Sequence, residues 1–423
     1  MLREMALDQL DLAEFVRPGD GIIFGQGCGE PEPLTQKLVA QRAAYSGAKV
    51  FFGTGFSKTF APEHADHLRF SGFGAIGSLR KLAAVGALDP IPCHLSAIAG
   101  LIAKGQIASE VVLLQVSPAN DKGEHSYGLV NDYMQTAVAK ARVVIAEVNA
   151  QIPFTPCDHL LRPEQITALV HTDRKPMELP GAAFGDLEKR IAQHLSDFIG
   201  DRATIQVGIG AIPEAIVAML HDRRDLGVHS GMIADSVVDL MERGVVTNAY
   251  KGMDAGITVS GVLFGTERLY RFAHQNPQIQ LCQTSHTHAA ASLARLNKLV
   301  SINSALEVDL TGQVNAEAIG SDYIGAVGGQ VDFVRAAAQS EGGASIIALG
   351  ALGKKGDTKI VARLSGPVTT ARSDVDVVAT EYGAVRLQGL SLRQRIKAMI
   401  SIAAPEHREI LAKQAKEVWG EWV

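Results

Sequence analysis

Asp201 to Val207 (DRATIQV) runs directly into Gly208 to Pro213 (GIGAIP), and an apolar helical pattern follows. A β-branched run, a G-x-G turn and a helix are typical of the strand-to-helix turns of α/β proteins. The same order occurs in the first half of the chain, where Asp20 to Phe24 leads into Gly25 to Pro31 and then a helix. Two copies at matching places predict a duplicated α/β unit.

Short apolar runs alternate with helical spacing along the whole chain. Glycine, proline, serine or asparagine clusters bound the runs, and windows such as Pro33 to Ala44 lie between them. This alternation predicts an α/β fold with largely parallel sheets. The predicted strands are Val50–Phe52, Val111–Val116, Val143–Ala146, Thr204–Val207, Ile346–Leu349 and Val375–Thr380.

A polar, broken segment divides the chain. At 423 residues the chain is long for one domain, so two domains are expected. Residues 172–186 include Pro176 and Pro180, and helical spacing resumes immediately after them. We therefore predict an N-terminal domain of residues 1–180 and a C-terminal domain of residues 181–423.

Composition limits the partners. The net charge is -5 and no run of five basic residues occurs, so nothing favours nucleic acid or an anionic membrane. No apolar stretch reaches about 18 residues and the N-terminus lacks a signal pattern, so we expect a cytoplasmic protein without a membrane span. The cysteines are far apart and form no C-x-x-C pair, which favours neither a disulfide framework nor a zinc site; they are Cys28, Cys93, Cys157 and Cys282.

The glycine turn of the second half is a candidate anion site. Its glycines let backbone N–H groups approach a negative group, and the following helix start favours negative charge. A dinucleotide site would need a third glycine where this chain has Pro213. A tight turn without a ligand is the remaining alternative.

A second glycine motif lies in Gly325 to Phe333, where Gly328 and Gly329 precede a predicted helix. Adjacent glycines leave backbone N–H groups unblocked, and such groups can form an oxyanion hole.

The neighbours of these motifs make the chain similar to a known family. The ordered motifs are Ser117–Gly123, Ile145–Asn149, Ser301–Gln313, Val368–Thr370 and Val378–Ala384. Together they resemble the acetyl-CoA hydrolase/4-hydroxybutyrate CoA-transferase family, a branch of the class I CoA transferases, over about Gly19 to Pro405. Some details also resemble the itaconate CoA-transferase branch.

The resemblance implies two related open α/β domains with the active site in the cleft between them. It also implies transfer of CoA from acetyl-CoA or succinyl-CoA to a small carboxylic acid such as itaconate or 4-hydroxybutyrate. In that chemistry a glutamate carboxylate attacks the thioester, and a glutamyl-CoA thioester forms. Coenzyme A is then a substrate, no metal or other cofactor is implied, and a homo-oligomer is expected.

The same resemblance implies which residues of this chain form the active site. The CoA-binding turn corresponds to Gly208, Ile209, Gly210, Ala211 and Ile212, and the second domain is expected to hold most of the CoA. Further CoA contacts are expected from Leu310, from the oxyanion glycines Gly328 and Gly329, and from Lys354 or Lys355. Contacts with the acid substrate are expected from Gln26, Asn149 and Asn303.

The chain departs from the family at the nucleophile. The family has a stretch like G-[IV]-H-[ST]-E-M-I, whereas this chain reads Gly227-Val-His-Ser-Gly231-Met-Ile, so Gly231 stands at the glutamate position. A carboxylate from elsewhere, a changed function and an inactivated variant are the three alternatives. Likeness to the itaconate branch points to Ala61 as the place of a lost carboxylate, and Glu63 is the alternative nucleophile in the same loop.

Other candidates receive structural interpretations. His286 and His288 have no evident third metal ligand and are expected in surface or packing roles. Cys157, Asp158 and His159 are too close in sequence to form a catalytic thiol arrangement. An acyl-CoA hydrolase, in which water resolves the intermediate, and a non-catalytic CoA-binding protein stay open as alternative functions.

Overall fold

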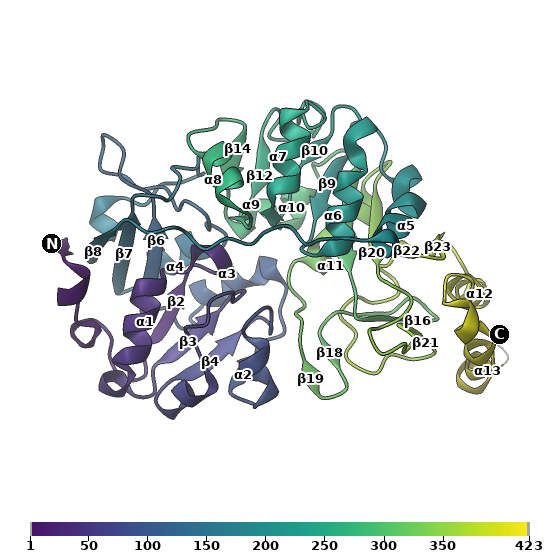
Figure 1. Cartoon of the computed structure of the whole chain (residues 1–423), viewed down its shortest axis with the longest axis horizontal. Helices are drawn as coiled ribbons and strands as arrows, with labels where there is room; N and C mark the ends of the chain where they lie inside the picture. Colours follow the sequence, from purple (N-terminus) through teal and green to yellow (C-terminus); the bar gives the residue numbers. More distant parts are fainter. Residues whose placement is uncertain (1, 421–423) are drawn as a thin grey trace.

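The computed structural model describes residues 2–420 and contains two large sheets, one in each half of the chain (Figure 1). The first sheet has eight parallel strands. Their spatial order is β1 (Arg3–Met5), β8 (Ala168–Thr172), β7 (Val143–Asn149), β6 (Val111–Val116), β2 (Gly21–Phe24), β3 (Lys49–Phe52), β4 (Arg69–Gly72) and β5 (Leu88–Pro90).

Both faces of the first sheet are buried, which explains the continuous apolar runs of its strands. Ile22 and Phe24 of β2 pack in one cluster with α1 (Glu32–Ala40) and α2 (Arg80–Ala84). Ile23, between them, packs in another cluster with α3 (Leu95–Ala103) and α4 (Met134–Lys140). Alternate side chains of a strand point to opposite faces, so the two helix layers cover opposite sides of the sheet.

The second sheet has six strands. Their order is β10 (Gly227–Val228), β9 (Thr204–Val207), β15 (Leu299–Ser304), β20 (Ala344–Ala348), β22 (Val377–Thr380) and β23 (Gly383–Arg386), and only β23 pairs antiparallel. The helices beside this sheet are α5 (Asp186–Leu195), α6 (Ala211–Ala218), α11 (Gln330–Gln339), α12 (Leu392–Ser401) and α13 (Arg408–Trp419).

Small sheets and short helices fill the space around the second sheet. One pair of strands is β11 (Met232–Ile233) with β13 (Val262–Leu263), and another is β12 (Thr258–Ser260) with β14 (Ile279–Leu281). The helices α7 (Asp235–Glu242), α8 (Glu267–Ala273), α9 (Thr284–Thr287) and α10 (Ala290–Leu293) lie in the same part of the chain. The remaining strands are β16 (Glu307–Asp309), β17 (Val314–Asn315), β18 (Ala318–Ile319), β19 (Asp322–Tyr323) and β21 (Ile360–Val361).

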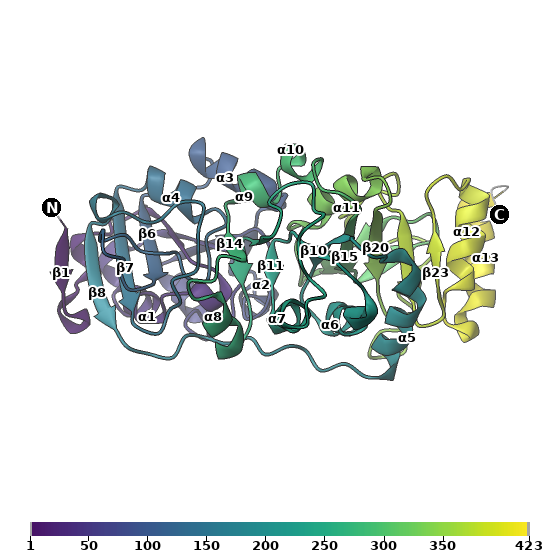
Figure 2. The ribbon, with the colours of Figure 1, turned by 90° about the horizontal axis from the view of Figure 1, so that it is seen from above.

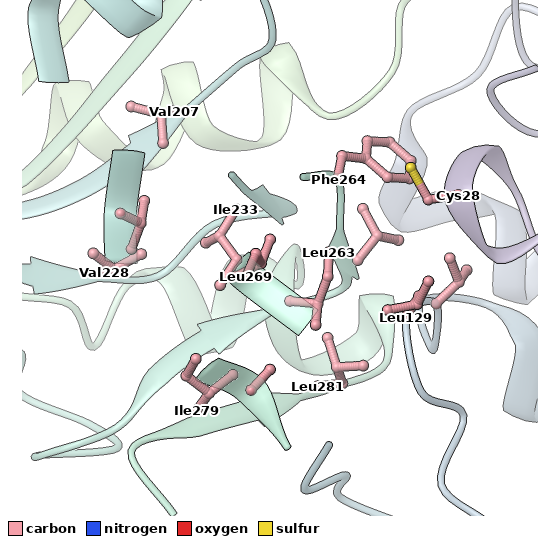
Figure 3. Close-up of a cluster of buried hydrophobic side chains, with 14 of the residues drawn as sticks. Cys28, Leu129, Val207, Val228, Ile233, Leu263, Phe264, Leu269, Ile279 and Leu281 are labelled. Atoms are coloured by element: carbon pink, nitrogen blue, oxygen red, sulfur yellow. The ribbon is translucent and has the colours of Figure 1, made fainter. Parts of the chain in front are cut away.

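One hydrophobic cluster joins the two halves. It includes Cys28 and Leu129 from the first half together with Val207 and Phe264 from the second, and Figure 3 shows Cys28 close to the ring of Phe264. The segment between β8 and α5 runs along one side of the molecule (Figure 2). The predicted division between residues 180 and 181 falls in this segment.

The sequence prediction of an α/β fold with parallel sheet cores is confirmed. The predicted strands Val111–Val116 and Thr204–Val207 coincide with β6 and β9, and the predicted helix after Asp186 is α5. Within residues 2–420, no helix combines the length and apolar character needed to span a bilayer. The same part of the chain holds no group of three or more His, Cys, Asp or Glu side chains that could bind a metal ion.

Candidate active site

A cavity of about 390 Å³ lies where the carboxyl ends of strands from both sheets meet. Gln26 and Thr54 follow β2 and β3 of the first sheet, while Gly208 and Asn303 lie at the ends of β9 and β15 of the second. Ligands of parallel α/β sheets bind beyond the carboxyl ends of strands. The position of the cavity is therefore that of a substrate site.

The cavity brings together seven of the site residues predicted from the sequence. Gly231 lies in its wall with the predicted oxyanion glycines Gly328 and Gly329, although it is distant from this adjacent pair in the sequence. The predicted residues that line it are Gln26, Gly208, Ile209, Gly231, Asn303, Gly328 and Gly329.

The turn after β9 presents backbone and one apolar side chain to the cavity. Gly210 has φ +127°, a conformation that favours glycine, and it precedes α6 without a side-chain cap. The first N–H groups of α6 are therefore open to an anion. Ile209 is 45% exposed although it is apolar, which suits contact with an apolar part of a ligand.

The second glycine motif has an open face. Gly328 has φ +55°, and a Cβ atom there would meet no atom within 4 Å. Gly329 precedes α11, whose first turn also has no side-chain cap. The carbonyl oxygen of Gly328 accepts a hydrogen bond from the backbone N–H of Leu95 (2.9 Å). This bond ties the motif to the first half of the chain and leaves N–H groups available for an oxyanion.

A glutamine and an aspartate form the polar wall on the side of the first sheet. The amide nitrogen of Gln26 donates to Oδ2 of Asp132 (2.5 Å), and its amide oxygen accepts from the N–H of Thr54 (2.8 Å). Oδ1 of Asp132 accepts from the backbone N–H of Tyr133 (2.5 Å). Burial raises the pKa of Asp132 to about 7, against the lowering effect of these hydrogen bonds.

Three ionisable side chains line the cavity within residues 2–420, namely Arg80, Asp132 and His288. Arg80 is the single cation among them, and its Nε donates to the carbonyl oxygen of Ile324 (3.0 Å). Sequence reasoning had not selected Arg80 or Asp132. No local pattern marks either residue, because each reaches the cavity only through the packing of separate segments.

His288 is buried and packed, which is one of the two roles predicted for it, and it also lines the cavity. Its side chain is 3% exposed and lines the cavity, and its ring packs edge-on against Phe333 at 4.9 Å between centroids. Burial lowers the pKa of His288 to about 3, so the imidazole is neutral at neutral pH. His286, two residues earlier, instead bonds to Oδ2 of Asp254 (2.8 Å) and does not line the cavity.

The loop that the sequence offered as a source of a carboxylate does not line the cavity. Ala61 begins a 3-10 helix, where its N–H donates to Nδ1 of His64 (3.1 Å). Phe60 anchors the loop among the rings of Phe24, Phe52 and Phe70, and Glu63 is exposed. The structure therefore gives no support to a nucleophile at either position.

Several predicted contact residues also lie outside the cavity wall. Asn149 is buried, and both polar atoms of its side chain already form hydrogen bonds within the protein. Its amide nitrogen donates to Arg174 O and Gln115 Oε1. Its amide oxygen accepts from the backbone N–H groups of Gln151 and Arg174. Leu310 is fully buried in a core cluster, and Lys354 and Lys355 are exposed on a loop. The other predicted residues outside the wall are Gly210, Ala211 and Ile212, which form the start of α6.

The Cys157, Asp158 and His159 group is not a thiol nucleophile. Burial raises the pKa of Cys157 to about 12, which keeps the thiol protonated. Oδ1 of Asp158 accepts from Asn131 and Gln135 rather than from a histidine side chain.

Comparison with known proteins agrees with the fold. The 4-hydroxybutyrate coenzyme A transferase of Clostridium kluyveri is 36% identical over 401 residues, which cover 94% of each chain. The succinyl-CoA:cyclohexane-1-carboxylate CoA transferase of Geobacter metallireducens is 30% identical and covers 98% of this chain and 96% of its own length.

Solved structures superimpose over nearly the whole chain. RipA from Yersinia pestis has a TM-score of 0.93 at 29% identity and covers 99% of this chain and 98% of its own. The 4-hydroxybutyrate CoA-transferase of Porphyromonas gingivalis has a TM-score of 0.83 at 32% identity, with coverage of 98% and 97%.

Two family profiles match separate parts of the chain. The acetyl-CoA hydrolase/transferase N-terminal domain matches residues 5–178, and the corresponding C-terminal domain matches residues 265–415. The turn at Gly208 and the departure at Gly231 lie between the two matches. With both domains and full-length relatives in agreement, this chain belongs to the acetyl-CoA hydrolase/transferase family and is an enzyme of the CoA-transferase type.

Proposed function

We propose that this chain transfers CoA from a small acyl-CoA, such as acetyl-CoA or succinyl-CoA, to a small carboxylic acid, such as 4-hydroxybutyrate or itaconate. The observation that carries the proposal is the single cavity in which the Gly208 turn, the Gly328–Gly329 pair and position 231 meet. The printed activities of the relatives support the same reaction class.

The lining of the cavity suits a thioester with a short acyl chain. Apolar side chains dominate it, including Phe73, Val262 and Phe264, and the polar groups include amides, hydroxyls and the three ionisable side chains. Such a wall excludes water and can hold an acyl chain, while a few polar groups orient the carbonyl. Arg80 is the cation that could pair with the carboxylate of the acceptor acid.

The CoA moiety would lie along the second half of the chain. The uncapped start of α6 could take a phosphate, and exposed Ile209 could contact the pantetheine arm. The Gly328–Gly329 backbone would then face the thioester oxygen. A homo-oligomer remains a prediction, and a place in the cytoplasm remains a prediction from the sequence pattern.

Acyl-CoA hydrolysis is the second candidate, and Gly231 is the observation that favours it. A side chain that forms an enzyme-bound CoA thioester is absent from that position, so water could take the place of the acceptor acid.

Product analysis separates the candidates. The purified protein is mixed with acetyl-CoA or succinyl-CoA and a panel of acids that includes 4-hydroxybutyrate and itaconate, and new thioesters are identified by mass. A transferase makes the acceptor thioester, whereas a hydrolase releases free CoA at a rate that does not depend on the acid. Binding of acyl-CoA without either product would instead mean a non-catalytic CoA-binding protein.

A further inference from the structure

The cavity holds a histidine beside the position at which the family resemblance places its nucleophile. We propose that His288 is the nucleophile of this chain and that it carries the acyl group as an acyl-imidazole during CoA transfer. This inference rests on the proposed function and names the group that performs its first step.

The first argument is one of space. A Cβ atom at Gly231 would lie 2.8 Å from both Cε1 and Nε2 of His288. A Cβ atom at Gly329 would lie 2.6 Å from the same Nε2. Such distances are too short for real side chains, so the imidazole takes this place only because both neighbours are glycine. The glycine at the usual nucleophile position thus makes room for a different nucleophile.

The second argument concerns the free nitrogen of the ring. Nδ1 of His288 lies 2.7 Å from the hydroxyl of Thr287, and that hydroxyl donates to the carbonyl oxygen of Gln283 (3.2 Å). When the hydroxyl donates its one proton to Gln283, it accepts the Nδ1–H of the ring, and in that tautomer Nε2 keeps its lone pair. Among residues 2–420, no hydrogen bond to Nε2 is present.

The histidine is also held in a fixed orientation. The backbone carbonyl of Thr287 accepts from Nε2 of the buried His229 (3.1 Å). The N–H of Thr284, at the start of α9, donates to the backbone oxygen of Asp132 (3.0 Å), and α9 packs against α3. A fixed ring loses little entropy when it attacks a bound thioester.

The other candidate nucleophile in the wall, Asp132, is less free. Both of its oxygens accept short hydrogen bonds, from Gln26 and from the backbone of Tyr133. These bonds favour a fixed polar wall over a group that must turn towards a carbonyl carbon.

The reaction balances without a further reagent. The Nε2 lone pair forms a bond to the acyl carbon, the C–S bond breaks, and its electrons leave with the CoA thiolate. The acceptor carboxylate then attacks the acyl carbon and returns the electron pair to Nε2, which gives a mixed anhydride. The thiolate attacks the acceptor carbonyl of that anhydride, and the donor acid leaves as its carboxylate.

Attack by a neutral imidazole on a neutral thioester creates a cation on the ring and an oxyanion together, so the net charge of the cavity does not change. The burial that lowers the pKa of His288 disfavours this cation, and the oxyanion formed beside it offsets that cost. The oxyanion would face the backbone of Gly328 and Gly329, beside the ring that becomes cationic.

Adduct mapping on the unchanged protein tests the inference. The protein is mixed with acyl-CoA in the absence of an acceptor, quenched, digested and analysed by mass. We expect the acyl group on the peptide that contains His288. A CoA thioester on Asp132, Glu63 or any other carboxylate would overturn the inference.

Variants and isotopes provide the second readout. His288→Gln is expected to lose the adduct and at least a hundredfold in kcat, whereas the control His286→Gln, in the short helix that ends just before His288 and outside the cavity, keeps both. With an acceptor labelled with ¹⁸O, the first turnover should place one label in the released donor acid. Label found in the enzyme, or full turnover in His288→Gln, would contradict a histidine nucleophile.

Failure of the inference and failure of the proposed function give different results. New thioester formed without an acyl-histidine would leave CoA transfer standing and remove His288 as the nucleophile. An acyl-histidine that yields no new thioester with any acid would keep the nucleophile and replace transfer by hydrolysis. The adduct is mapped on the unchanged protein, so the test does not depend on the folding of His288→Gln.

Discussion

A Cβ atom at Gly231 would lie 2.8 Å from Nε2 of His288, so the glycine and the histidine depend on each other. The carbonyl oxygen of Gly231 accepts hydrogen bonds from the N–H groups of Gly261 and Val262 (3.1 Å each), which hold the glycine in place. A side chain at position 231 therefore requires the ring of His288 to move.

The contact between Gly231 and His288 predicts what happens when a glutamate is introduced at position 231. Gly231→Glu alone should reduce activity and cost about 1–3 kcal/mol of unfolding free energy, because the new side chain overpacks the buried ring. Gly231→Glu combined with His288→Ala should relieve the collision and let CoA become attached to the new carboxylate. Denaturant unfolding and adduct mapping check both variants, and full activity in the single variant would contradict this account of the pair.

The loop near Ala61 allows a separate test. Ala61 lies at the start of a 3-10 helix outside the cavity wall, and Phe60 is fixed in an aromatic cluster. We therefore expect Ala61→Glu, at a half-buried position away from the cavity, to leave kcat within about twofold of the unchanged protein. A CoA adduct on the introduced side chain would show that the loop supplies the nucleophile after all.

Much of the fold could be predicted from the sequence, because local patterns determine it. The runs that became β6 and β9 are continuous apolar segments bounded by turns, as strands buried on both faces must be. The glycine turns could be predicted as well, because a strand, two glycines and a helix start are all visible in a short stretch of sequence. Their meeting in one cavity followed from the family resemblance rather than from any local feature.

The polar part of the site could not be predicted in the same way. His288 matters because Gly231 and Gly329 leave room for it, and these three positions are distant in the sequence. Asn149 shows the converse, because a polar residue at a strand end is used to hold Arg174 in the segment between the two halves. Which polar residues face a ligand depends on tertiary packing, which residue type alone does not reveal.

Binding of CoA should depend on the turn after β9. A Cβ atom at Gly208 would meet only Ile302 O at 3.6 Å, an ordinary contact, so Gly208→Ala should fold normally. We expect it to weaken CoA binding about tenfold, or ~1.4 kcal/mol, by crowding the open backbone of the turn. Gly200→Ala, where a Cβ atom meets nothing within 4 Å, is the control, and calorimetry is the measurement. Equal affinities in the two variants would remove this turn from the CoA site.

Gly328 should matter for catalysis more than for stability. Gly328→Ala places a side chain at φ +55°, which costs about 1–2 kcal/mol of unfolding free energy wherever it occurs. Gly105→Ala, at φ +71° and away from the cavity, should lose a similar amount. Only Gly328→Ala should also lower kcat, by about 10²-fold if an oxyanion donor is displaced. Equal kcat values for the two variants would mean that Gly328 forms no oxyanion hole.

Acid should destabilise the fold partly through His288. Burial lowers its pKa to about 3, whereas an unfolded histidine titrates near 6.5, so the unfolded state binds more protons between these values. The free energy of unfolding therefore falls as pH falls below about 6.5. His229, which burial and the nearby Lys251 also hold at about 3, acts in the same direction, while the raised pKa of Asp132 acts in the opposite one.

Comparison with a variant isolates the contribution of His288. His288→Gln has no proton to bind, so its free energy of unfolding should fall less steeply with acid than that of the unchanged protein. The expected difference between pH 6 and pH 5 is about 1 kcal/mol, since each unbalanced proton contributes about 1.4 kcal/mol per pH unit. The contributions of His229 and Asp132 are common to both proteins and cancel. Urea unfolding at each pH gives the two slopes, and parallel curves would show that the ring of His288 takes up a proton in the folded protein.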